Sequence, residues 1–396
     1  MLNHRGGSSN TNNDEYDNNN SKDNFKVTPW EVEGEIDYNK LIVQFGTQPI
    51  TSEIIERIKR VTGEVHPMLK LQYFFSHRDL DWILNKHEEG ESFYLYTGRG
   101  PSGMVHIGHM MPWLFTKYFQ EKFNSKLLFQ LTDDEKFLQT QDRSSEEIRH
   151  YTYENILDII AVGFNPDKTK IIIDTKHIQH LYPIATEIAK RITFSTAKAV
   201  FGFSNSTNIG MIGFPPIQAA PCFLPSIIEN KPTPVLIPAA IDQDPYWRVT
   251  RDVAERMGYY KPAQIHSKFL PGLGMLGKMS SSKPETALFT MDDPEVTDKK
   301  VLAAFTGGQA TTALQRQLGG NALGCPVFWY LRYLFDTERQ SDERLLKCKS
   351  GNLLCGECKS DLSKESKNFI VEFKRRREKA KDVTAKFMFD GAPYEK

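Results

Sequence analysis

The segment Ser92-Phe-Tyr-Leu-Tyr-Thr97 runs directly into Gly98-Arg-Gly-Pro-Ser-Gly103 and then into an apolar stretch that carries His106 and His109. Its first six residues are typical of a buried strand, and the glycines that follow let a backbone approach a nucleotide closely. A helix that begins after such a turn presents free N–H groups and the positive end of its dipole to phosphate. The segment therefore predicts one strand–turn–helix unit of a nucleotide-binding fold.

Three further segments are predicted strands: 126–131, 170–174 and 233–238. Helical segments separate them, and this alternation favours a parallel sheet with both faces covered. We therefore expect an α/β fold with a Rossmann-like nucleotide-binding domain. Beyond Ser282 the strand signal fades and helical patterns follow. This change places a domain boundary just after Ser282 and predicts a C-terminal α-helical domain over 283–396.

The N-terminal region divides into two parts. Residues 1–24 are dominated by Asn, Ser, Asp and Gly, a composition that cannot bury enough apolar surface to offset chain entropy. We therefore expect a disordered tail, followed by the α/β domain over 25–282. This domain begins with short predicted strands at 28–36 and 40–45, and then with a helix whose predicted N-cap is Ser52.

Composition limits the possible classes of protein. The 396 residues include 50 Lys and Arg against 50 Asp and Glu, so a local basic patch would have to bind any RNA. No apolar run approaches the roughly 20 residues that a membrane span needs. The five cysteines form an odd, sparse set, which favours a reducing compartment over a disulfide framework. We expect a cytoplasmic enzyme.

Two groups of residues near the C-terminus leave alternatives open. Cys348, Cys355 and Cys358 could bind zinc, but structural zinc usually has four ligands and no histidine lies nearby in the sequence. Free thiols are therefore the favoured interpretation. The basic run within 374–381 is either a contact for RNA or a solvated helix face.

The first motif with chemical meaning consists of His106, Gly108 and His109. Histidines three residues apart on a helix share one face, where their N–H groups can clamp the charge that grows on ATP phosphates during attack at the α-phosphorus. Gly108 leaves room for the adenine or the ribose. The alternative is a turn with two structural histidines.

The second motif is Lys278-Met-Ser-Ser-Ser282, at the end of a glycine-rich segment that starts at Gly272. A mobile loop of this kind can close over a triphosphate and deliver the Lys278 ammonium in the transition state. The alternative is a polar surface loop with an ordinary lysine.

Polar residues also follow two predicted strands, at the edge where open parallel sheets bind ligands. Gln130 and Glu135 could bind an ammonium or an indole N–H, and Gln243 could hydrogen-bond the same substrate. Trp247 could form a pocket wall. The alternatives are a solvated acidic turn at Glu135 and ordinary core packing of Trp247.

With both motifs in this order, the chain resembles class I aminoacyl-tRNA synthetases, and among them the eukaryotic-type cytosolic tryptophanyl-tRNA synthetases. The resemblance covers about 25–389, and 28–30 with 37–43 resembles the family's β-hairpin over the ATP site. It also rests on four segments that separate this family from the tyrosyl enzymes. They are Tyr94-Leu-Tyr-Thr-Gly-Arg-Gly-Pro-Ser102, Gln130-Leu-Thr-Asp-Asp-Glu135, Phe214-Pro-Pro-Ile-Gln-Ala-Ala-Pro221 and Ala240-Ile-Asp-Gln-Asp-Pro-Tyr-Trp-Arg248.

The resemblance implies a tryptophan–tRNA ligase that uses ATP as a substrate together with Mg²⁺. It implies tRNA(Trp) and L-tryptophan as partners, a homodimer, and an anticodon-binding role for 283–396. It implies no tightly bound metal, no membrane and no DNA. The catalytic residues would be His106, His109, Lys278 and Ser280. ATP would be held by Gly98, Arg99, Gly100, His106, Gly108, His109, Lys278, Met279 and Ser280. Tryptophan would be bound by Tyr96, Gln130, Glu135, Gln218, Gln243 and Trp247.

The sequence departs from the family pattern at several positions. Ser281 stands where this branch often has Ala. Trp247 and Ala239 stand where Phe and Cys are frequent, so we expect slightly different pocket walls. Gln309 and Ala310 fall where relatives carry a charged Arg-Asp pair, so the family's anticodon contacts are not assigned there.

Three other functions stay open at this point. A tyrosyl-tRNA synthetase is the nearest alternative. A non-catalytic RNA-binding protein on a synthetase scaffold is less favoured, because His106, His109 and Lys278 are all present. A small-molecule nucleotidylyltransferase could share the first motif, but the long helical C-terminal part argues against it.

Overall fold

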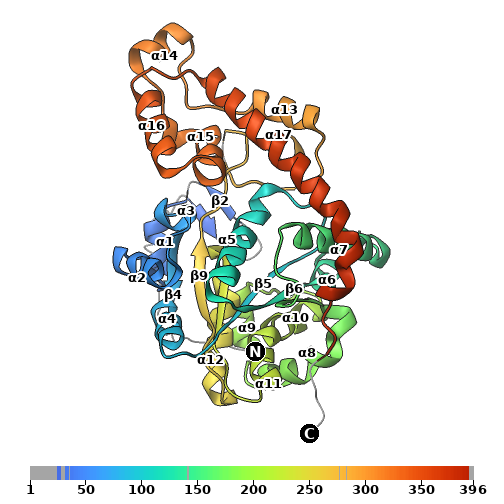
Figure 1. Ribbon diagram of the computed structural model, residues 1–396. Helices are drawn as coiled ribbons and strands as arrows, with labels where there is room; N and C mark the ends of the chain where they lie inside the picture. Colours follow the sequence, from blue (N-terminus) through green and yellow to red (C-terminus); the bar gives the residue numbers. More distant parts are fainter. Residues whose placement is uncertain are drawn as a thin grey trace, which may run out of the picture.

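The fold is described from a computed structural model (Figure 1). The structure describes residues 25–27, 32–34, 36–140, 142–275, 277–281 and 283–391. The predicted disordered tail, 1–24, lies outside the described residues. Across the described ranges, no helix is both long enough and apolar enough to span a lipid bilayer.

A seven-stranded sheet in the order β3-β4-β9-β8-β5-β6-β7 forms the centre of the α/β part. Strands β9, β8, β5, β6 and β7 run parallel to one another. Strand β4 pairs antiparallel with β9, and β3 pairs antiparallel with β4 at the edge of the sheet. The four predicted strands are confirmed as β5, β6, β7 and β8, whereas β3, β4 and β9 were not predicted. In sheet order the strands are Gln48–Pro49, Phe74–Arg78, Ala263–Ser267, Val235–Ala240, Tyr94–Arg99, Lys126–Leu131 and Thr169–Ile173.

Both faces of the sheet are covered, because successive residues of a strand point to opposite sides. In β5, Leu95 packs into one apolar core while Tyr94 and Tyr96 pack into the other. This two-sided burial explains why the predicted strands are apolar without alternation. The first core includes residues of α2 (Ser52–Thr62), α3 (Pro67–Lys70), α4 (Leu80–Glu88), α5 (Ile107–Phe123) and α7 (Ser145–Ala161). The second includes residues of α8 (Asp174–Ala189), α9 (Phe194–Phe201), α10 (Ile209–Ala219), α11 (Leu224–Ile228) and α12 (Asp244–Ala254).

The predicted strand at 40–45 is wrong, because helix α1 (Tyr38–Phe45) occupies this segment. The Asp37 carboxylate caps the helix by accepting N–H groups of its first turn. Leu41 and Phe45, one helical turn apart, are both buried. A short apolar run fits a strand or a buried helix equally well, and the cap and the burial at this spacing decide for the helix.

The N-terminal hairpin consists of β1 (Phe25–Val27) and β2 (Val32–Gly34), which pair antiparallel. It therefore lies before α1 and does not include it.

The helix predicted from Ser52 is confirmed as α2, but its N-cap is Thr51, whose hydroxyl accepts the N–H of Ile54 at 3.3 Å. The predicted cap is thus one residue late.

The part of the chain that follows the α/β fold is helical, as predicted, and forms the upper lobe in Figure 1. Its longest helix, α17, packs against α13 and then runs down along α7 of the α/β part. The helices are α13 (Pro294–Ala303), α14 (Thr312–Leu318), α15 (Pro326–Tyr330), α16 (Glu338–Lys349), α17 (Cys355–Ala380) and α18 (Thr384–Phe387).

The two parts are joined by buried contacts. Arg377 of α17 is 4 % exposed and donates hydrogen bonds to the carboxylates of Asp158 and Glu154 on α7. Near the C-terminus, Met388 forms a parallel bridge with Ile171 at the edge strand β7. The helical lobe therefore shares a core with the α/β part, and the boundary after Ser282 remains a prediction about domains.

Candidate active site

Strands β5 and β8 are paired only near their starts, where Tyr94 and Leu95 face Val235 and Leu236. Beyond these residues the two strands part, while β5 stays paired with β6 along its length. Strand order reverses here, and open α/β sheets bind ligands at such a switch point. A cavity with about 1560 Å³ of empty space, open at its mouth, lies at this place.

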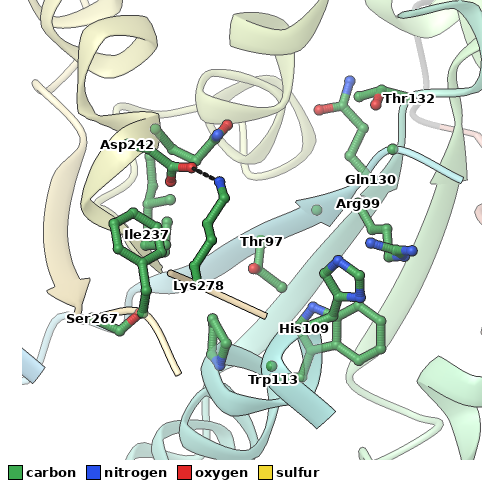
Figure 2. Close-up of a pocket in the computed structure, with 18 of the residues that line it drawn as sticks. Thr97, Arg99, His109, Trp113, Gln130, Thr132, Ile237, Asp242, Ser267 and Lys278 are labelled. Carbon is green, nitrogen blue, oxygen red and sulfur yellow. Dashed lines mark ion pairs between the residues drawn. The ribbon is translucent and has the colours of Figure 1, made fainter. Parts of the chain in front are cut away.

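Every residue predicted to act in catalysis, ATP binding or tryptophan binding lines this one cavity. They come from strands β5 and β6, from helices α5, α6 (Asp133–Gln139), α10 and α12, from the 3₁₀ turn η2 (Ile241–Gln243), and from the loops after β5 and β9. Figure 2 shows Lys278 and Asp242 on one side of Thr97, and His109 and Arg99 on the other. The residues are Tyr96, Gly98, Arg99, Gly100, His106, Gly108, His109, Gln130, Glu135, Gln218, Gln243, Trp247, Lys278, Met279 and Ser280.

The two histidines of the first motif stack on each other at the start of α5. Their ring centroids are 3.4 Å apart and the rings are nearly parallel. His106 is the N-cap of α5 and not a residue inside the helix, so the shared face arises at the cap. The backbone N–H of His106 donates to Nδ1 of His109 at 3.3 Å. The proton of a neutral His109 ring is then on Nε2, which is left as a donor.

Both imidazoles are neutral near pH 7. Burial, and after it the charge of Arg99, lowers the pKa of His106 to about 3. The same causes hold the pKa of His109 well below its ordinary value. The buried Nδ1 of His106 has no hydrogen-bond partner within the part of the chain that the structure describes. A buried polar atom of this kind is normally paired, so it is a candidate contact for a ligand.

A side chain would be tightly crowded at two glycine positions around these histidines. A Cβ on Gly108 would lie 3.1 Å from Nδ1 of His106, and one on Gly98 would lie 3.0 Å from the backbone oxygen of Gln130. Arg99 is anchored because its Nε donates to Oδ1 of Asn155 at 2.7 Å. Gly98 and Gly108 thus allow a ligand to approach the backbone closely. Arg99 adds a positive charge, held in place by Asn155, behind the two histidines.

The Lys278 ammonium reaches the cavity from the loop that follows β9. Its Nζ lies 3.8 Å from Oδ2 of Asp242 and 5.2 Å from the centre of the Phe269 ring. Met279 beside it is 5 % exposed, and its backbone N–H donates to the oxygen of Leu270 at 3.0 Å. The buried Met279 anchors the loop next to Lys278, whose ammonium lies near the Asp242 carboxylate and over the Phe269 ring.

A buried polar chain crosses the floor of the cavity. The Tyr96 hydroxyl donates to Oε1 of Gln130 and lies 2.7 Å from the backbone oxygen of Gln218. Nε2 of Gln130 donates to Oδ1 of Asp174 at 2.7 Å. Because Asp174 takes up the amide N–H₂ group, the oxygen of Gln130 is directed toward Tyr96.

Glu135 and Trp247 form two other walls. The Glu135 carboxylate accepts the hydroxyl of Thr132 at 2.7 Å and lies 3.0 Å from Nζ of Lys136. The Trp247 ring packs edge-to-face on Tyr96 with centroids 5.3 Å apart. Nε1 of Trp247 is buried without a partner within the described residues. Trp247 thus lines the cavity and also packs into the core, and its role as a wall of the substrate pocket stays a prediction.

Sequence reasoning missed two carboxylates of this site. Asp174 ends the predicted strand 170–174, and a polar residue at the carboxyl end of a buried strand is a usable signal. Asp242 lies between the strand β8 and Gln243, within the segment 240–248 on which the resemblance rests, but the resemblance implies no role for it. Burial raises the pKa of Asp242, and the nearby Lys278 opposes this change.

The chain belongs to the class I tRNA synthetases. The family model described as "tRNA synthetases class I (W and Y)", which covers enzymes for tryptophan and for tyrosine, matches residues 88–371. The assignment to class I is therefore confirmed. Both motifs lie within this range, as do all the residues predicted to bind ATP or tryptophan.

The chain is also similar to proteins named tryptophan–tRNA ligase. One from Pyrococcus furiosus is 52 % identical over 374 residues, covering 93 % of this chain and 95 % of that protein. One from Pyrobaculum arsenaticum is 51 % identical over 360 residues, covering 91 % and 96 %. A crystal structure of Plasmodium falciparum tryptophanyl-tRNA synthetase is 40 % identical with a TM-score of 0.85, covering 90 % and 99 %. The similarity to archaeal proteins at this level means that the narrower "eukaryotic-type" assignment is not confirmed.

Proposed function

We infer that the chain is a tryptophan–tRNA ligase. It activates L-tryptophan with ATP to give tryptophanyl-adenylate and pyrophosphate, and then transfers tryptophan to the terminal adenosine of tRNA(Trp). The observation that carries this function is the convergence of both motifs and of the predicted tryptophan ligands on one cavity at the switch point of the sheet. Relatives named tryptophan–tRNA ligase at about 50 % identity support the choice of tryptophan over tyrosine.

In the first step, the tryptophan carboxylate attacks the α-phosphorus and pyrophosphate leaves. No protein nucleophile is needed, so the protein supplies position and charge stabilisation. The neutral rings of His106 and His109 offer N–H donors, and Lys278 offers an ammonium across the cavity. Gly98 and Gly108 allow close approach of the nucleotide. Mg²⁺ would accompany ATP and neutralise part of its charge.

Tryptophan would lie over the polar chain on the floor of the cavity. The oxygens of Tyr96 and Gln130 can accept the indole N–H, and the Glu135 carboxylate can accept the substrate ammonium. Such acceptors discriminate against a substrate without the matching donor, because the buried groups would be left unpaired. The Trp247 ring would close the apolar side of the pocket.

Helix α1, which follows the N-terminal hairpin, would contribute to the ATP site. The Tyr38 hydroxyl accepts the backbone N–H of Phe269 at 3.0 Å, and the Phe269 ring lies beneath the Lys278 ammonium. The N-terminal segment is therefore one contact away from the second motif. We further propose the division into an α/β catalytic domain over 25–282 and an anticodon-binding helical domain over 283–396, which is supported by the absence of strands from the described residues after β9.

We extend the proposal to assembly and location. A homodimer is supported by exposed large apolar side chains on three neighbouring elements, namely Tyr182 on α8, Phe194 on α9 and Ile209 on α10. Light scattering of the purified chain tests it. A cytoplasmic location is supported by five cysteines that form no disulfide.

The deciding experiment is exchange of labelled pyrophosphate into ATP with each amino acid in turn. We expect exchange with tryptophan and little with tyrosine. Exchange with tyrosine alone would make the chain a tyrosyl enzyme, and no exchange with any amino acid would favour a non-catalytic RNA-binding role. Charging of tRNA(Trp) transcripts then tests the second step.

A further inference from the structure

A lysine that belongs to neither motif also reaches the active-site cavity. Lys268 follows β9 directly and lines the same cavity as Lys136 and Lys278. Its ammonium lies over the ring of Tyr38 on α1, 5.3 Å from the ring centre. Sequence reasoning gave Lys268 no role, because no motif surrounds it in the chain.

The three lysines of the cavity differ in what balances their charge. Nζ of Lys136 lies 3.0 Å from a carboxylate oxygen of Glu135, and Nζ of Lys278 lies 3.8 Å from one of Asp242. Among the residues that the structure describes, the Lys268 ammonium has neither an ion pair nor a hydrogen bond, and its partner is the Tyr38 ring. A half-buried cation without an anion is costly, so an anionic ligand is expected beside Lys268.

The surroundings of Lys268 disfavour its charged form further. Burial lowers the pKa of Lys268, and after it the charge of Arg332, which belongs to the helical lobe. Arg332 is held in place because it donates a hydrogen bond to the Ser341 hydroxyl at 2.6 Å. Two cations, one from each lobe, thus act on each other near the cavity. An anion that binds beside Lys268 would favour its charged form.

Lys268 is attached firmly to the sheet. Its backbone N–H donates to the backbone oxygen of Tyr73 at 2.8 Å, which continues the pairing of β4 with β9. The chain beyond it turns back on itself, because Pro271 forms an antiparallel bridge with Lys278. Lys268 and Lys278 therefore lie on the two sides of one folded loop. A charge that is held in place before the reaction stabilises a transition state with little reorganisation.

The order of the strands indicates which part of ATP Lys268 can reach. The polar chain proposed to bind tryptophan starts from β5 and β6, so the α-phosphorus has to come close to these strands. Strand β8 lies between β5 and β9. Neighbouring strands are about 4.8 Å apart, so β9 is roughly 10 Å from β5. A cation at the end of β9 therefore faces the part of the triphosphate that is remote from tryptophan.

We propose that Lys268 is a second cationic ligand of the triphosphate, and that it binds the β- and γ-phosphates, which leave as pyrophosphate. This inference rests on the proposed activation of tryptophan by ATP. As a tryptophan carboxylate oxygen bonds to the α-phosphorus, the bond from that phosphorus to the oxygen bridging to the β-phosphorus breaks. Negative charge then moves onto the pyrophosphate. The Lys268 ammonium stabilises this charge and keeps its proton.

The test compares pyrophosphate with a ligand that lacks the β- and γ-phosphates. Lys268→Met keeps an apolar side chain over the Tyr38 ring and removes the charge. We expect its KM for pyrophosphate, measured as ATP formation from tryptophanyl-adenylate, to rise about tenfold or more, because one charge-assisted contact is lost. The ligand for comparison is an analogue of tryptophanyl-adenylate with a sulfamoyl group in place of the phosphate. Calorimetry should show that the analogue binds Lys268→Met as it binds the parent chain.

Two control variants separate the charge from other effects. Lys268→Arg keeps a cation and should restore most of the KM for pyrophosphate. Lys261→Met removes a lysine that precedes β9 and pairs with Glu255, and it should keep the parent's KM. If Lys268→Met does not fold, Lys268→Gln takes its place in the same measurements.

Three outcomes would count against the role of Lys268. An active parent chain together with a Lys268→Met variant that keeps the parent's KM for pyrophosphate would overturn this role alone. Equal weakening of pyrophosphate and of the analogue, with a lower melting temperature in the absence of ligand, would mean that Lys268 only supports α1. A parent chain without any exchange in the presence of tryptophan would overturn the proposed function and this role together.

Discussion

The ammonium of Lys278 lies 3.8 Å from the carboxylate of Asp242, on the side of the cavity opposite to His109. This separation is too long for a direct hydrogen bond, so the pair holds Lys278 near the site without fixing it. A phosphate that enters between the two walls would offer the ammonium a stronger partner. The long contact with Asp242 thus leaves the Lys278 ammonium able to bind the ATP phosphates during the reaction.

We predict that Lys278→Ala slows tryptophan activation far more than it weakens tryptophan binding. Loss of one charge stabiliser of the transition state should cost about 3 kcal/mol, or roughly a hundredfold in rate. Single-turnover adenylate formation measures the rate, and calorimetry measures the affinity. Asp242→Asn, which keeps the side-chain shape, should have a much smaller effect. An unchanged single-turnover rate in Lys278→Ala would rule out the proposed role.

Glu135 is expected to bind the tryptophan ammonium and not merely to shape a turn. Glu135→Ala should weaken tryptophan binding about tenfold or more, because a buried charge would lose its acceptor. Lys136→Met removes the cation now paired with Glu135 and serves as the control, which should not weaken tryptophan binding. Normal tryptophan affinity in Glu135→Ala, together with a clear loss of melting temperature without ligand, would show that the acidic turn is structural.

Asp174 is expected to position Gln130 for substrate binding. Asp174→Ala would free the Gln130 amide to rotate, and we expect the KM for tryptophan to rise several-fold while the KM for ATP changes little. Asp174→Asn retains an acceptor oxygen at the same place and should restore most of the tryptophan KM. Equal increases in both KM values would instead indicate a general disturbance of the sheet edge.

Stability should fall on the acid side of neutrality because His106 is buried in its neutral form. Its pKa is lowered to about 3, against about 6.5 in an unfolded chain. Between these values the unfolded state binds more protons. The contribution of this histidine is therefore complete above about pH 6.5 and is lost as the pH falls toward 3, by at most about 1.4 kcal/mol per pH unit.

The measurement compares urea unfolding at pH 7 and pH 5. His106→Asn should lose less stability over this interval than the parent chain. His150→Asn, at an exposed histidine on α7, is the control and should show the parent's dependence on pH. If His106→Asn shows the same pH dependence as the parent, burial of a neutral His106 is not a source of acid sensitivity.

Arg377 should matter for stability far more than its neighbours in the basic run. Arg377→Met leaves Asp158 buried without its cation, and loss of one partner of a buried pair costs roughly 3–5 kcal/mol. Arg375→Met, two residues away and paired only with Glu372 at the surface among the described residues, should leave the free energy of unfolding close to the parent's. Chemical denaturation measures both. Similar losses in the two variants would contradict the buried link.

From the sequence by itself came four strands of the sheet, the class of enzyme and a set of candidate site residues that line one cavity. Strands 126–131 and 170–174 were predictable because two-sided burial leaves long apolar runs between helical patterns. His106 and Lys278 were predictable because their chemistry demands particular side chains next to glycines. These features are local, so each can be recognised from a few neighbouring residues.

Only the tertiary structure decided the rest, because the remaining features depend on contacts between distant segments. Helix α1, which replaces the strand predicted at 40–45, follows from burial of Leu41 and Phe45 against Phe75 of β4, which its own residues do not reveal. Arg377 belongs to a charged run, yet packing of α17 on α7 buries it beside Asp158. Partners that are far apart in the sequence come into contact only when the core forms, so local sequence patterns do not predict them.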